Sequence, residues 1–477
     1  MKNIKKTKIV ATLGPASSTK DIIREMMVAG VNVFRINFSH ASFDDVRERI
    51  QYVRELNKEL GFNVAILADL QGPKLRVGNM EEGVVVSVGD RVAFTTKKID
   101  VGSADKVYMN YKRFPKDVKK GERILLDDGK LIFEVLQTDG KTEVIAEVIQ
   151  GGPLKSKKGV NLPNTDISLP ALTKKDIEDA VFAIEQEVDW IALSFVRHKA
   201  DLDELKELIK KHSKYQIPVI SKVEKPQALE NIKEIVENSD GIMVARGDLG
   251  VEIPAEEVPL TQKQLVLHAK AARIPVIIAT QMMESMIDGL TPTRAEVNDV
   301  ANSVMDGADA VMLSGETSVG KYPIEVIQTM RKIVVGVENS PLINLNMQAP
   351  QNKNDRFITK STCYHAALMA NEIEAKAICT LTNSGYTAYQ ISASRPSASI
   401  LVFTSNKRIL SQLNLLWGVK CHYYDRYVST DETVSDVNNI AKEKGYVKKG
   451  DALVNLVAMP VAAKGMVNTL RVSVIKD

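Results

Sequence analysis

The sequence predicts an α/β protein: a TIM (β/α)8 barrel with an inserted all-β lid domain and a C-terminal α/β domain. Eight short apolar runs predict the barrel, because each has the composition of a strand that is buried on both faces. Most runs are followed by a segment with the period of a helix, such as 42–60 and 225–238, which fits a series of βα units. The runs span residues 9–13, 31–36, 64–68, 190–194, 219–221, 241–245, 276–279 and 310–313.

The longest interval between runs separates the third from the fourth, and its pattern of apolar and polar residues differs from that of the βα units. It contains short strand-like segments, and Asp127-Asp128-Gly129 between two of them is typical of a hairpin turn. We therefore expect an all-β lid domain over residues 73–170, which divides the barrel into residues 1–72 and 171–340. The strand-like segments are 84–88, 92–95, 123–126, 131–135 and 143–148.

A second boundary follows the eighth run. Residues 341–355 are rich in Asn, Gln and Pro and have no clear period, which predicts a linker. The chain beyond it predicts a C-terminal α/β regulatory domain over residues 356–477. Its strand-like runs are 377–382, 399–403 and 451–456, and its helical segments are 360–371 and 431–444.

Length and composition indicate a large cytosolic enzyme. A chain of 477 residues exceeds what one hydrophobic core usually supports. The 63 Lys and Arg against 60 Asp and Glu leave a formal charge of +3 and no long basic tract, so the electrostatic footprint of a nucleic-acid-binding protein is missing. The 3 cysteines are widely spaced and cannot form a disulfide framework. No apolar stretch is long enough for a membrane span, and no signal peptide is evident, so we expect a cytoplasmic location.

Polar residues suited to phosphate chemistry follow the predicted strands at their carboxyl ends, where a TIM barrel carries its catalytic groups. Lys222 and Glu224 end the fifth run, and Asp248 follows the sixth. Carboxylates for a hard metal ion, cations and small hydroxyls are the groups that phosphoryl transfer requires. Further polar residues at strand ends are Arg35, Asn37, Ser39, His40, Asp69, Lys74, Arg76, Gly247, Thr280, Gln281 and Glu316.

These residues lie in a set of motifs that resembles the pyruvate kinase family. The resemblance covers nearly the full chain, including the β insertion and the C-terminal domain, and many long motifs occur in order. They span residues 7–15, 35–40, 69–76, 158–163, 220–224, 243–250, 279–286, 292–296 and 312–317.

The resemblance implies transfer of the phosphoryl group of phosphoenolpyruvate to ADP, which gives pyruvate and ATP in the last step of glycolysis. It implies that Glu224 and Asp248 hold Mg²⁺ or Mn²⁺ and that Lys222 stabilises the enolate and the phosphoryl group. Arg35 would bind the transferring phosphate. The substrate carboxylate would contact Gly247, Asp248 and Thr280, and enolate protonation would occur near Thr280 or through a water relay. The residues implied to contact the nucleotide are Asn37, Ser39, His40, Arg76 and Lys158, with Lys158 carried by the closing lid.

The monovalent-cation site departs from the usual family pattern. The family binds K⁺ through the positions of Asn37, Ser39, Asp69 and the carbonyl of Leu70, and K⁺-dependent members have a glutamate where this chain has Lys74. The residues Leu70, Gln71, Lys74 and Val77 are similar to the K⁺-independent pattern, in which the lysine ammonium supplies the charge. We therefore expect that K⁺ can bind but is not required.

The resemblance also implies allosteric regulation and a homotetramer. Residues 382–387 resemble the family's loop for an effector phosphate, with Thr382, Ser384 and Thr387 as the candidate hydroxyls. The later loop at residues 458–465 lacks the arginine of members that bind fructose 1,6-bisphosphate, although Lys464 is a possible substitute. The effector is therefore open between a sugar monophosphate, a nucleotide, a bisphosphate and none.

Purely structural roles for these residues, and two other functions for the protein, remain open at this point. A single lysine, glutamate or histidine at a strand end is more often a solvated rim or packing residue until several converge. Gly315 to Lys321 approaches the P-loop pattern of a nucleotide hydrolase, but Tyr322 stands where that motif needs Ser or Thr. A catalytically silent metabolite sensor on the same scaffold is the other alternative, because a fold does not fix a function.

Overall fold

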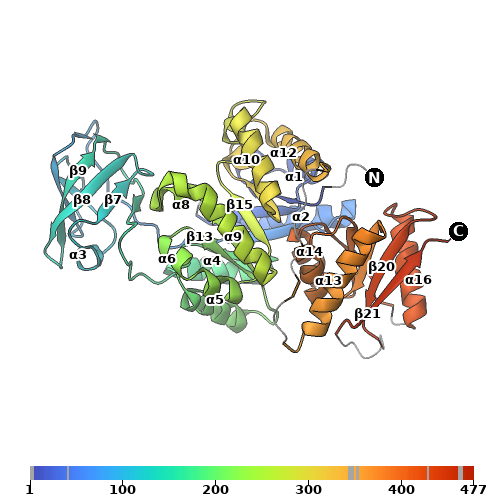
Figure 1. Ribbon diagram of the computed structural model, residues 1–477. Coiled ribbons are helices and arrows are strands. Elements are labelled where there is room, and N and C mark those ends of the chain that lie inside the picture. The colour runs from blue at the N-terminus through green and yellow to red at the C-terminus, as the bar shows by residue number, and fades with distance from the viewer. Residues whose placement is uncertain are drawn as a thin grey trace.

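The computed structural model describes residues 5–39, 42–341, 347, 349–350, 354–426, 429–459 and 466–476. Figure 1 shows a central barrel, a β-rich part at one end of the molecule and an α/β part at the other. The predicted fold class is confirmed, because the barrel strands form one closed parallel sheet and the C-terminal strands form a separate sheet.

The barrel closes in the order β1-β16-β15-β14-β13-β12-β3-β2, and every neighbouring pair is parallel. All eight predicted runs form its strands. Their side chains are almost all buried, which is why the sequence shows continuous apolar runs and no alternation. The strands are β1 (Lys8–Leu13), β2 (Val33–Asn37), β3 (Ala65–Asp69), β12 (Trp190–Leu193), β13 (Val219–Val223), β14 (Gly241–Ala245), β15 (Val276–Ala279) and β16 (Ala310–Leu313).

Helices cover the outside of the barrel, and local sequence sets their ends. Ser42 and Thr173 cap helix N-termini with their hydroxyls, and Gly61 and Gly307 end helices in the left-handed conformation that glycine favours. The barrel helices are α1 (Lys20–Ala29), α2 (Phe43–Leu60), α4 (Lys174–Glu185), α5 (Lys199–His212), α6 (Pro226–Glu230), α7 (Ile232–Asn238), α8 (Arg246–Glu252), α9 (Val258–Ala272), α10 (Arg294–Asp306), α11 (Gly315–Ser318) and α12 (Pro323–Glu338).

A repeated hydrogen bond ties the strands together at the amino end of the barrel. Asn32, Asp189, Asp240 and Asp309 each stand directly before a strand, namely β2, β12, β14 and β16. Each side chain accepts the backbone N–H of a residue at the start of the neighbouring strand, at 2.8–3.1 Å. Because these N–H groups precede the regular ladder, the polar side chains satisfy donors that burial would otherwise leave unpaired.

The inserted segment forms a β unit with its own hydrophobic core, and the expected all-β composition is interrupted by one short helix, α3. The turn at Asp127-Asp128-Gly129 is confirmed: all three residues have positive φ, and the antiparallel strands β7 and β8 flank it. A six-stranded sheet has the order β11-β7-β8-β9-β5-β6, and β10 pairs with β4. The elements are β4 (Val85–Val86), β5 (Arg91–Thr95), β6 (Lys106–Tyr108), α3 (Phe114–Asp117), β7 (Arg123–Leu126), β8 (Leu131–Thr138), β9 (Glu143–Gln150), β10 (Gly152–Pro153) and β11 (Val160–Asn161).

The C-terminal part is a five-stranded sheet of order β19-β18-β17-β20-β21, in which only the edge strand β21 runs antiparallel among the described residues. The expected strands and helices are present, and the structure adds β19, β21, α14 and α15. The elements are α13 (Phe357–Glu372), β17 (Ala377–Leu381), α14 (Tyr386–Ala393), β18 (Ser399–Thr404), α15 (Lys407–Gln412), β19 (Val419–Tyr423), α16 (Thr430–Glu443), β20 (Ala452–Val457) and β21 (Thr469–Val474).

This part closes the amino end of the barrel. Tyr389 of α14 and Leu415 pack against the core inside the barrel, and the indole N–H of Trp190 donates to the carbonyl of Gln412 at 3.0 Å. Arg395 forms a buried pair with Asp309 through two contacts, at 2.8 Å and 2.9 Å. The barrel floor and the C-terminal sheet are therefore one continuous packed structure.

Across the described part of the chain, no helix is long and apolar enough to cross a membrane. Cys363, Cys379 and Cys421 are buried free thiols.

Candidate active site

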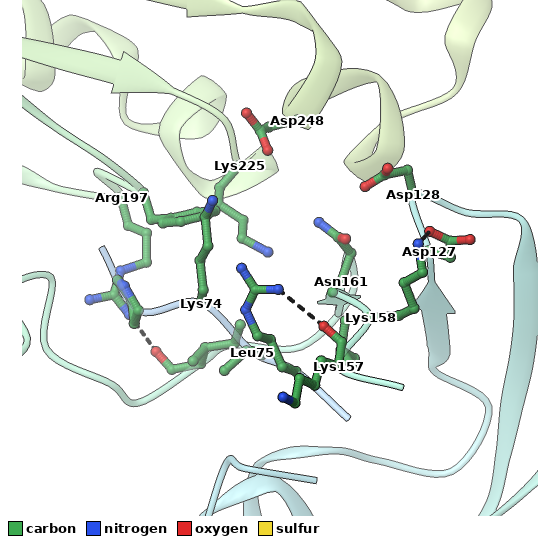
Figure 2. Close-up of a pocket in the computed structure, with 16 residues that line it drawn as sticks. Lys74, Leu75, Asp127, Asp128, Lys157, Lys158, Asn161, Arg197, Lys225 and Asp248 are labelled. Atoms are coloured by element: carbon green, nitrogen blue, oxygen red, sulfur yellow. Dashed lines mark hydrogen bonds and ion pairs between the residues drawn. The ribbon is translucent and has the colours of Figure 1, made fainter. Parts of the chain in front are cut away.

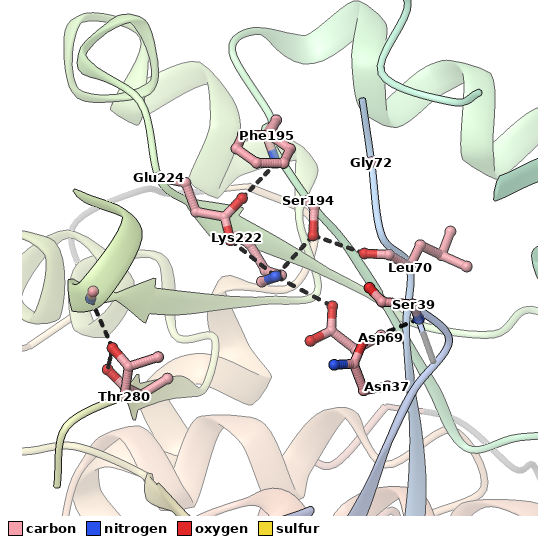
Figure 3. A network of polar contacts seen from close by, with 12 residues as sticks. Asn37, Ser39, Asp69, Leu70, Gly72, Ser194, Phe195, Lys222, Glu224 and Thr280 are labelled. Carbon is pink, nitrogen blue, oxygen red and sulfur yellow. Dashed lines mark hydrogen bonds and ion pairs between the residues drawn. The ribbon is translucent and has the colours of Figure 1, made fainter. Parts of the chain in front are cut away.

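Polar residues from the carboxyl ends of β2, β3, β13, β14 and β15 lie at one end of the barrel, and Asp69, Ser194 and Glu224 contact the ammonium of Lys222 there (Figure 3). Its Nζ lies 2.8 Å from Glu224 Oε1 and 3.3 Å from Asp69 Oδ1, and it donates a 2.7 Å hydrogen bond to Ser194 Oγ. Burial lowers the pKa of Lys222, but the carboxylates of Asp69, Glu224 and Asp248 outweigh it and raise the pKa above its usual value. Lys222 is therefore a fixed positive charge and a poor proton donor.

Arg35 is held beside this cluster by Asp69. The carboxylate of Asp69 is 1 % exposed and accepts the Nε–H of Arg35 at 2.6 Å, with a second nitrogen of the guanidinium also at 2.6 Å. A terminal nitrogen of the Arg35 guanidinium also donates a hydrogen bond to the Thr12 hydroxyl at 3.1 Å. Burial raises the pKa of Asp69, but Lys222 and Arg35 outweigh it and lower the pKa below the usual value. A two-point contact of this kind fixes the plane of the guanidinium.

Glu224 and Asp248 are the carboxylates available to a cation. Glu224 is buried, and its Oε2 accepts the Phe195 N–H at 2.8 Å. Burial raises the pKa of Glu224, and the charge of Asp248 adds to the shift. Asp248 is exposed at the start of α8 and lines the cleft described below. Two carboxylates, with the remaining ligands from water and substrate phosphates, are the donor set that Mg²⁺ prefers.

A metal site built entirely from protein side chains would need more ligands than Glu224 and Asp248 provide. Among the residues that the structure describes, no cluster of three or more His, Cys, Asp or Glu side chains could hold a metal ion. The pair of Glu224 and Asp248 therefore fits a site that the substrate completes.

Thr280 follows β15 with a backbone φ of 71°, and Gln281 follows with 53°. A positive φ is strained for a β-branched residue. The Thr280 hydroxyl accepts the N–H of Gly247 at 2.7 Å and donates to the Ala279 carbonyl at 2.6 Å, while Arg246 donates to the Thr280 carbonyl at 2.7 Å. Figure 3 shows Thr280 with this contact to α8, and the strained backbone is thus fixed at the edge of the cluster.

A cleft of about 290 Å³ separates this cluster from the β-rich part. Figure 2 shows Lys158 and Asp127 on the β side and Lys225, Arg197 and Asp248 on the barrel side. Lys158 Nζ lies 2.8 Å from Asp127 Oδ1. Arg76 also lines the cleft, and its guanidinium donates to the Lys157 carbonyl at 3.0 Å. Positive groups from both sides converge on one space of small-molecule size.

Lys74 extends into this cleft toward the side where Asp248 lies (Figure 2). Burial lowers the pKa of Lys74, with the charge of Asp248 opposing the shift. Within residues 5–39, 42–341 and the later described segments, its ammonium has no hydrogen bond or ion pair. Lys74 therefore carries a positive charge into the site without a partner of its own.

Asn37, Ser39, Asp69 and Leu70 lie side by side at the ends of β2 and β3 (Figure 3). The Asn37 side-chain oxygen accepts the Ser39 N–H at 3.1 Å, and the Leu70 carbonyl accepts the Ser194 hydroxyl at 2.7 Å. The oxygens expected for a monovalent cation are thus neighbours. His40 lies outside the described residues.

The candidate effector residues Thr382, Ser384 and Thr387 line a pocket of about 560 Å³ in the C-terminal part. Arg356 and Arg426 line the same pocket, and sequence reasoning missed both. They stand on segments far from the loop, so no local pattern connects them to it. Lys464, the possible substitute for the effector arginine, lies outside the described residues.

Other residues that sequence reasoning missed orient the cluster. Ser194 contacts Lys222, and Arg246 forms an ion pair with Asp299 while it holds the Thr280 carbonyl. Ser194 and Arg246 directly follow β12 and β14, so the rule that located Lys222 could have identified them. The P-loop alternative is not supported: Gly315–Ser318 is the short helix α11, and Lys321 is paired on the surface with Asp288 at 2.9 Å.

Comparison with known proteins agrees with this geometry. Residues 4–327 match the family model of the pyruvate kinase barrel domain, and residues 360–473 match that of the pyruvate kinase alpha/beta domain. The chain is 42% identical over 476 residues to the pyruvate kinase of Geobacillus stearothermophilus, covering 99% of this chain and 81% of the relative. It is 42% identical over 474 residues to that of Corynebacterium glutamicum, covering 99% and 98%.

A solved structure gives the same result. The crystal structure of a pyruvate kinase from Cryptosporidium parvum superposes with a TM-score of 0.91 at 32% identity, covering 98% of this chain and 96% of that one. With fold, strand-end residues and full-length similarity in agreement, the chain belongs to the pyruvate kinase family, the phosphotransferases that convert phosphoenolpyruvate and ADP to pyruvate and ATP.

Proposed function

We propose that phosphoenolpyruvate binds at Lys222 and Arg35 and that ADP occupies the cleft next to them. The single observation that carries the proposal is the position of Lys222, a buried ammonium between Glu224 and Asp69 at the carboxyl end of the barrel. The reaction breaks the bond from phosphorus to the enolate oxygen and forms a bond to an oxygen of ADP. Lys222 opposes the charge that appears on the enolate and on the phosphoryl group in flight.

Arg35 positions the transferring phosphate. Its guanidinium is fixed in orientation by Asp69, and this suits a two-point contact with phosphate oxygens. Gly247, Asp248 and Thr280 bind the substrate carboxylate from the start of α8 and the end of β15. Lys222 is a poor acid because of its raised pKa, so the proton that converts the enolate to pyruvate arrives from the Thr280 side, through the hydroxyl or a water.

Enzymes of this family depend on a divalent metal and, in general, on K⁺. We assign Glu224 and Asp248 as the ligands of Mg²⁺ or Mn²⁺, because their oxygens are hard donors and the substrate can complete the coordination. A bound divalent ion supplies positive charge to the enolate and phosphate oxygens. The role of the two carboxylates is to hold the ion. The backbone N–H of Phe195 and the ammonium of Lys222 orient Glu224 for this role.

The nucleotide contacts come from both sides of the cleft. Arg76 and Lys158 line it on the β side, whereas Asn37 and Ser39 stand at the end of β2. We propose that residues 73–170 move as a lid that brings Lys158 to the phosphates of ADP. Gly72 is suited to be the hinge: its φ is 69°, and a side chain there would meet the Phe195 ring at 2.7 Å.

Lys74 replaces the requirement for K⁺ in this proposal. The oxygens of Asn37, Ser39, Asp69 and Leu70 can still bind the ion, but the ammonium of Lys74, which has no partner among the described residues, already supplies positive charge to the adjoining cleft.

Regulation and assembly follow the family pattern in our proposal. The pocket of Thr382, Ser384 and Thr387 binds a phosphorylated effector, supported by the two arginines that also line it. We propose a homotetramer and, from the buried free thiols, a reducing cytoplasmic location. The silent-sensor alternative has no observation in its favour.

The test is substitution of Lys222. Lys222→Gln should reduce ADP-dependent pyruvate formation by roughly 10²–10³-fold, because it removes the charge that stabilises the enolate. Lys211→Gln, an exposed lysine on α5, is the matched control and should retain full activity. Thermal melting of both variants would show that each is folded. Near-normal turnover of a folded Lys222→Gln enzyme would overturn the assignment.

A further inference from the structure

A second polar cavity lies between the barrel and the C-terminal part, away from the cleft at the carboxyl end of the strands. Its volume is about 750 Å³, and α7, α9, α13 and α14 contribute to its walls. Figure 1 shows α9 beside α13 and α14. The guanidinium of Arg273, directly after α9, donates to the Gln390 carbonyl of α14 at 3.2 Å. Two parts of the chain therefore form one cavity.

Positive charge dominates the cavity walls. Lys233, Lys270, Arg273 and Lys360 line it, and Glu237 is the one carboxylate among its described lining residues. In the part of the chain that the structure describes, the ammonium groups of Lys233, Lys270 and Lys360 form no hydrogen bond or ion pair. Like charges gathered without counter-ions repel one another, so the arrangement is stabilised when an anion enters.

The ionisation of these lysines shows the same imbalance. Burial lowers the pKa of Lys270 to about 8, and the charge of Arg395 adds to the shift. Burial also lowers the pKa of Lys360, together with the charges of Arg273 and Arg356. Burial is the main cause of both shifts; neighbouring cations add to each, and Asp309 opposes the shift of Lys270.

An unpaired acceptor lies in the same cavity wall. Gln390 is 4 % exposed and lines the cavity, and its side-chain oxygen has no hydrogen-bond partner among the residues that the structure describes. Buried polar atoms are normally paired, so this oxygen marks a place for a donor. The cavity therefore offers cations for an acidic group and an acceptor for a neutral donor.

We propose that this interdomain cavity binds a small phosphorylated metabolite that also carries a hydroxyl, at a site separate from the pocket of Thr382, Ser384 and Thr387. A phosphate suits the cations, and a hydroxyl suits the Gln390 oxygen. Tyr386 lines both cavities, at the start of α14. Ligands in the two sites would share this residue, so we expect their binding to be coupled.

The experiment uses glycerol 3-phosphate and inorganic phosphate as probes and hydrogen–deuterium exchange of the full-length protein as the readout. Glycerol 3-phosphate should protect peptides from residues 264–275 and 357–366 in the wild type. The same protection should persist in Thr382→Ala/Ser384→Ala, which alters the other pocket. Lys360→Glu should raise the concentration for half-protection about tenfold or more, because it removes a charge-assisted contact. The control Lys211→Glu, a charge reversal on α5, should leave it unchanged.

A second variant separates ligand contact from damage to the domain packing. Gln390→Leu should remove any preference for glycerol 3-phosphate over inorganic phosphate and leave phosphate binding itself unchanged. The proposal is overturned if protection is confined to the residues of the other pocket or of the active site. It is overturned equally if Lys360→Glu protects with wild-type affinity.

Discussion

We propose that Lys74 removes the need for K⁺, so substitution of Lys74 by glutamate should make the enzyme depend on K⁺. Lys74 lies in the cleft with Asp248, and the charges that act on the pKa of Lys74 are those of Asp248, Lys222, Arg76 and Glu224. The ammonium has no partner within the described part of the chain, so its charge is available to the substrates. In the wild type, tetramethylammonium as the only bulk cation should support full pyruvate formation.

The magnitude follows from the charge that is removed. Two unit charges about 4 Å apart near a protein surface interact by about 4 kcal/mol. Lys74 is exposed and solvent screens its charge, so we take about 2 kcal/mol, or roughly 30-fold in turnover, for Lys74→Gln without K⁺. Lys74→Glu reverses the charge and should lose about twice that free energy.

The assay is the initial rate of ADP-dependent pyruvate formation with Mg²⁺, first in tetramethylammonium and then after addition of K⁺. K⁺ should restore most of the activity of Lys74→Glu and change the wild-type rate little, because the oxygens of Asn37, Ser39, Asp69 and Leu70 remain in place. A wild type that is inactive until K⁺ is added would refute the reasoning. A Lys74→Glu enzyme that needs no K⁺ would refute it as well.

Three further substitutions test other parts of the structure. Lys158→Gln should raise the KM for ADP several-fold and change the KM for phosphoenolpyruvate little. Steady-state kinetics measures both constants, with Lys119→Gln, a change of an exposed lysine, as the control. Equal changes in the two KM values would contradict the assignment of Lys158 to the nucleotide. Arg395→Leu leaves Asp309 buried without its partner and should lower the unfolding free energy by about 3–5 kcal/mol in urea titrations, whereas loss of an exposed ion pair should have little effect. Burial lowers the pKa of His422 to about 4, and the charges of Lys444 and Lys420 add to the shift. The native state therefore binds fewer protons than the unfolded state below the ordinary pKa of histidine. The unfolding free energy should fall by up to about 3 kcal/mol as the pH drops from about 6.5 to 4. His422→Phe should abolish this part of the pH dependence, and a melting profile identical to that of the wild type would argue against it.

The barrel could be predicted from sequence because its strands are buried on both faces. Such strands appear as continuous apolar runs, and all eight were located within a few residues of their observed bounds. The strands β19 and β21 were missed for a related reason. β19 alternates Val, Lys, Cys and His, and β21 is a largely exposed edge strand, so neither shows a run that differs from its surroundings.

The site residues divide in the same way. Arg35, Lys222 and Glu224 lie at the carboxyl ends of strands or directly after them and belong to long motifs, so position and resemblance together could identify them. The contact of Arg246 with Thr280 and the positions of Arg356 and Arg426 around the effector pocket depend on distances between segments far apart in the chain. The four residues before β2, β12, β14 and β16 resemble ordinary loop residues in the sequence, and only the structure reveals their common hydrogen bond.

The short helix α14 relates the C-terminal pockets to the barrel floor. Its first residue, Tyr386, lines both the candidate effector pocket and the interdomain cavity, and Tyr389 one turn later packs against the core inside the barrel. Arg395, shortly after the helix ends, is held by Asp309, which also accepts the backbone N–H of Val276, the first residue of β15. At its opposite end β15 leads into Thr280, the strained residue of the active site. In our proposal, a ligand that shifts α14 would therefore act through Arg395 and Asp309 on a strand that ends next to Thr280, the residue we assign to the substrate carboxylate.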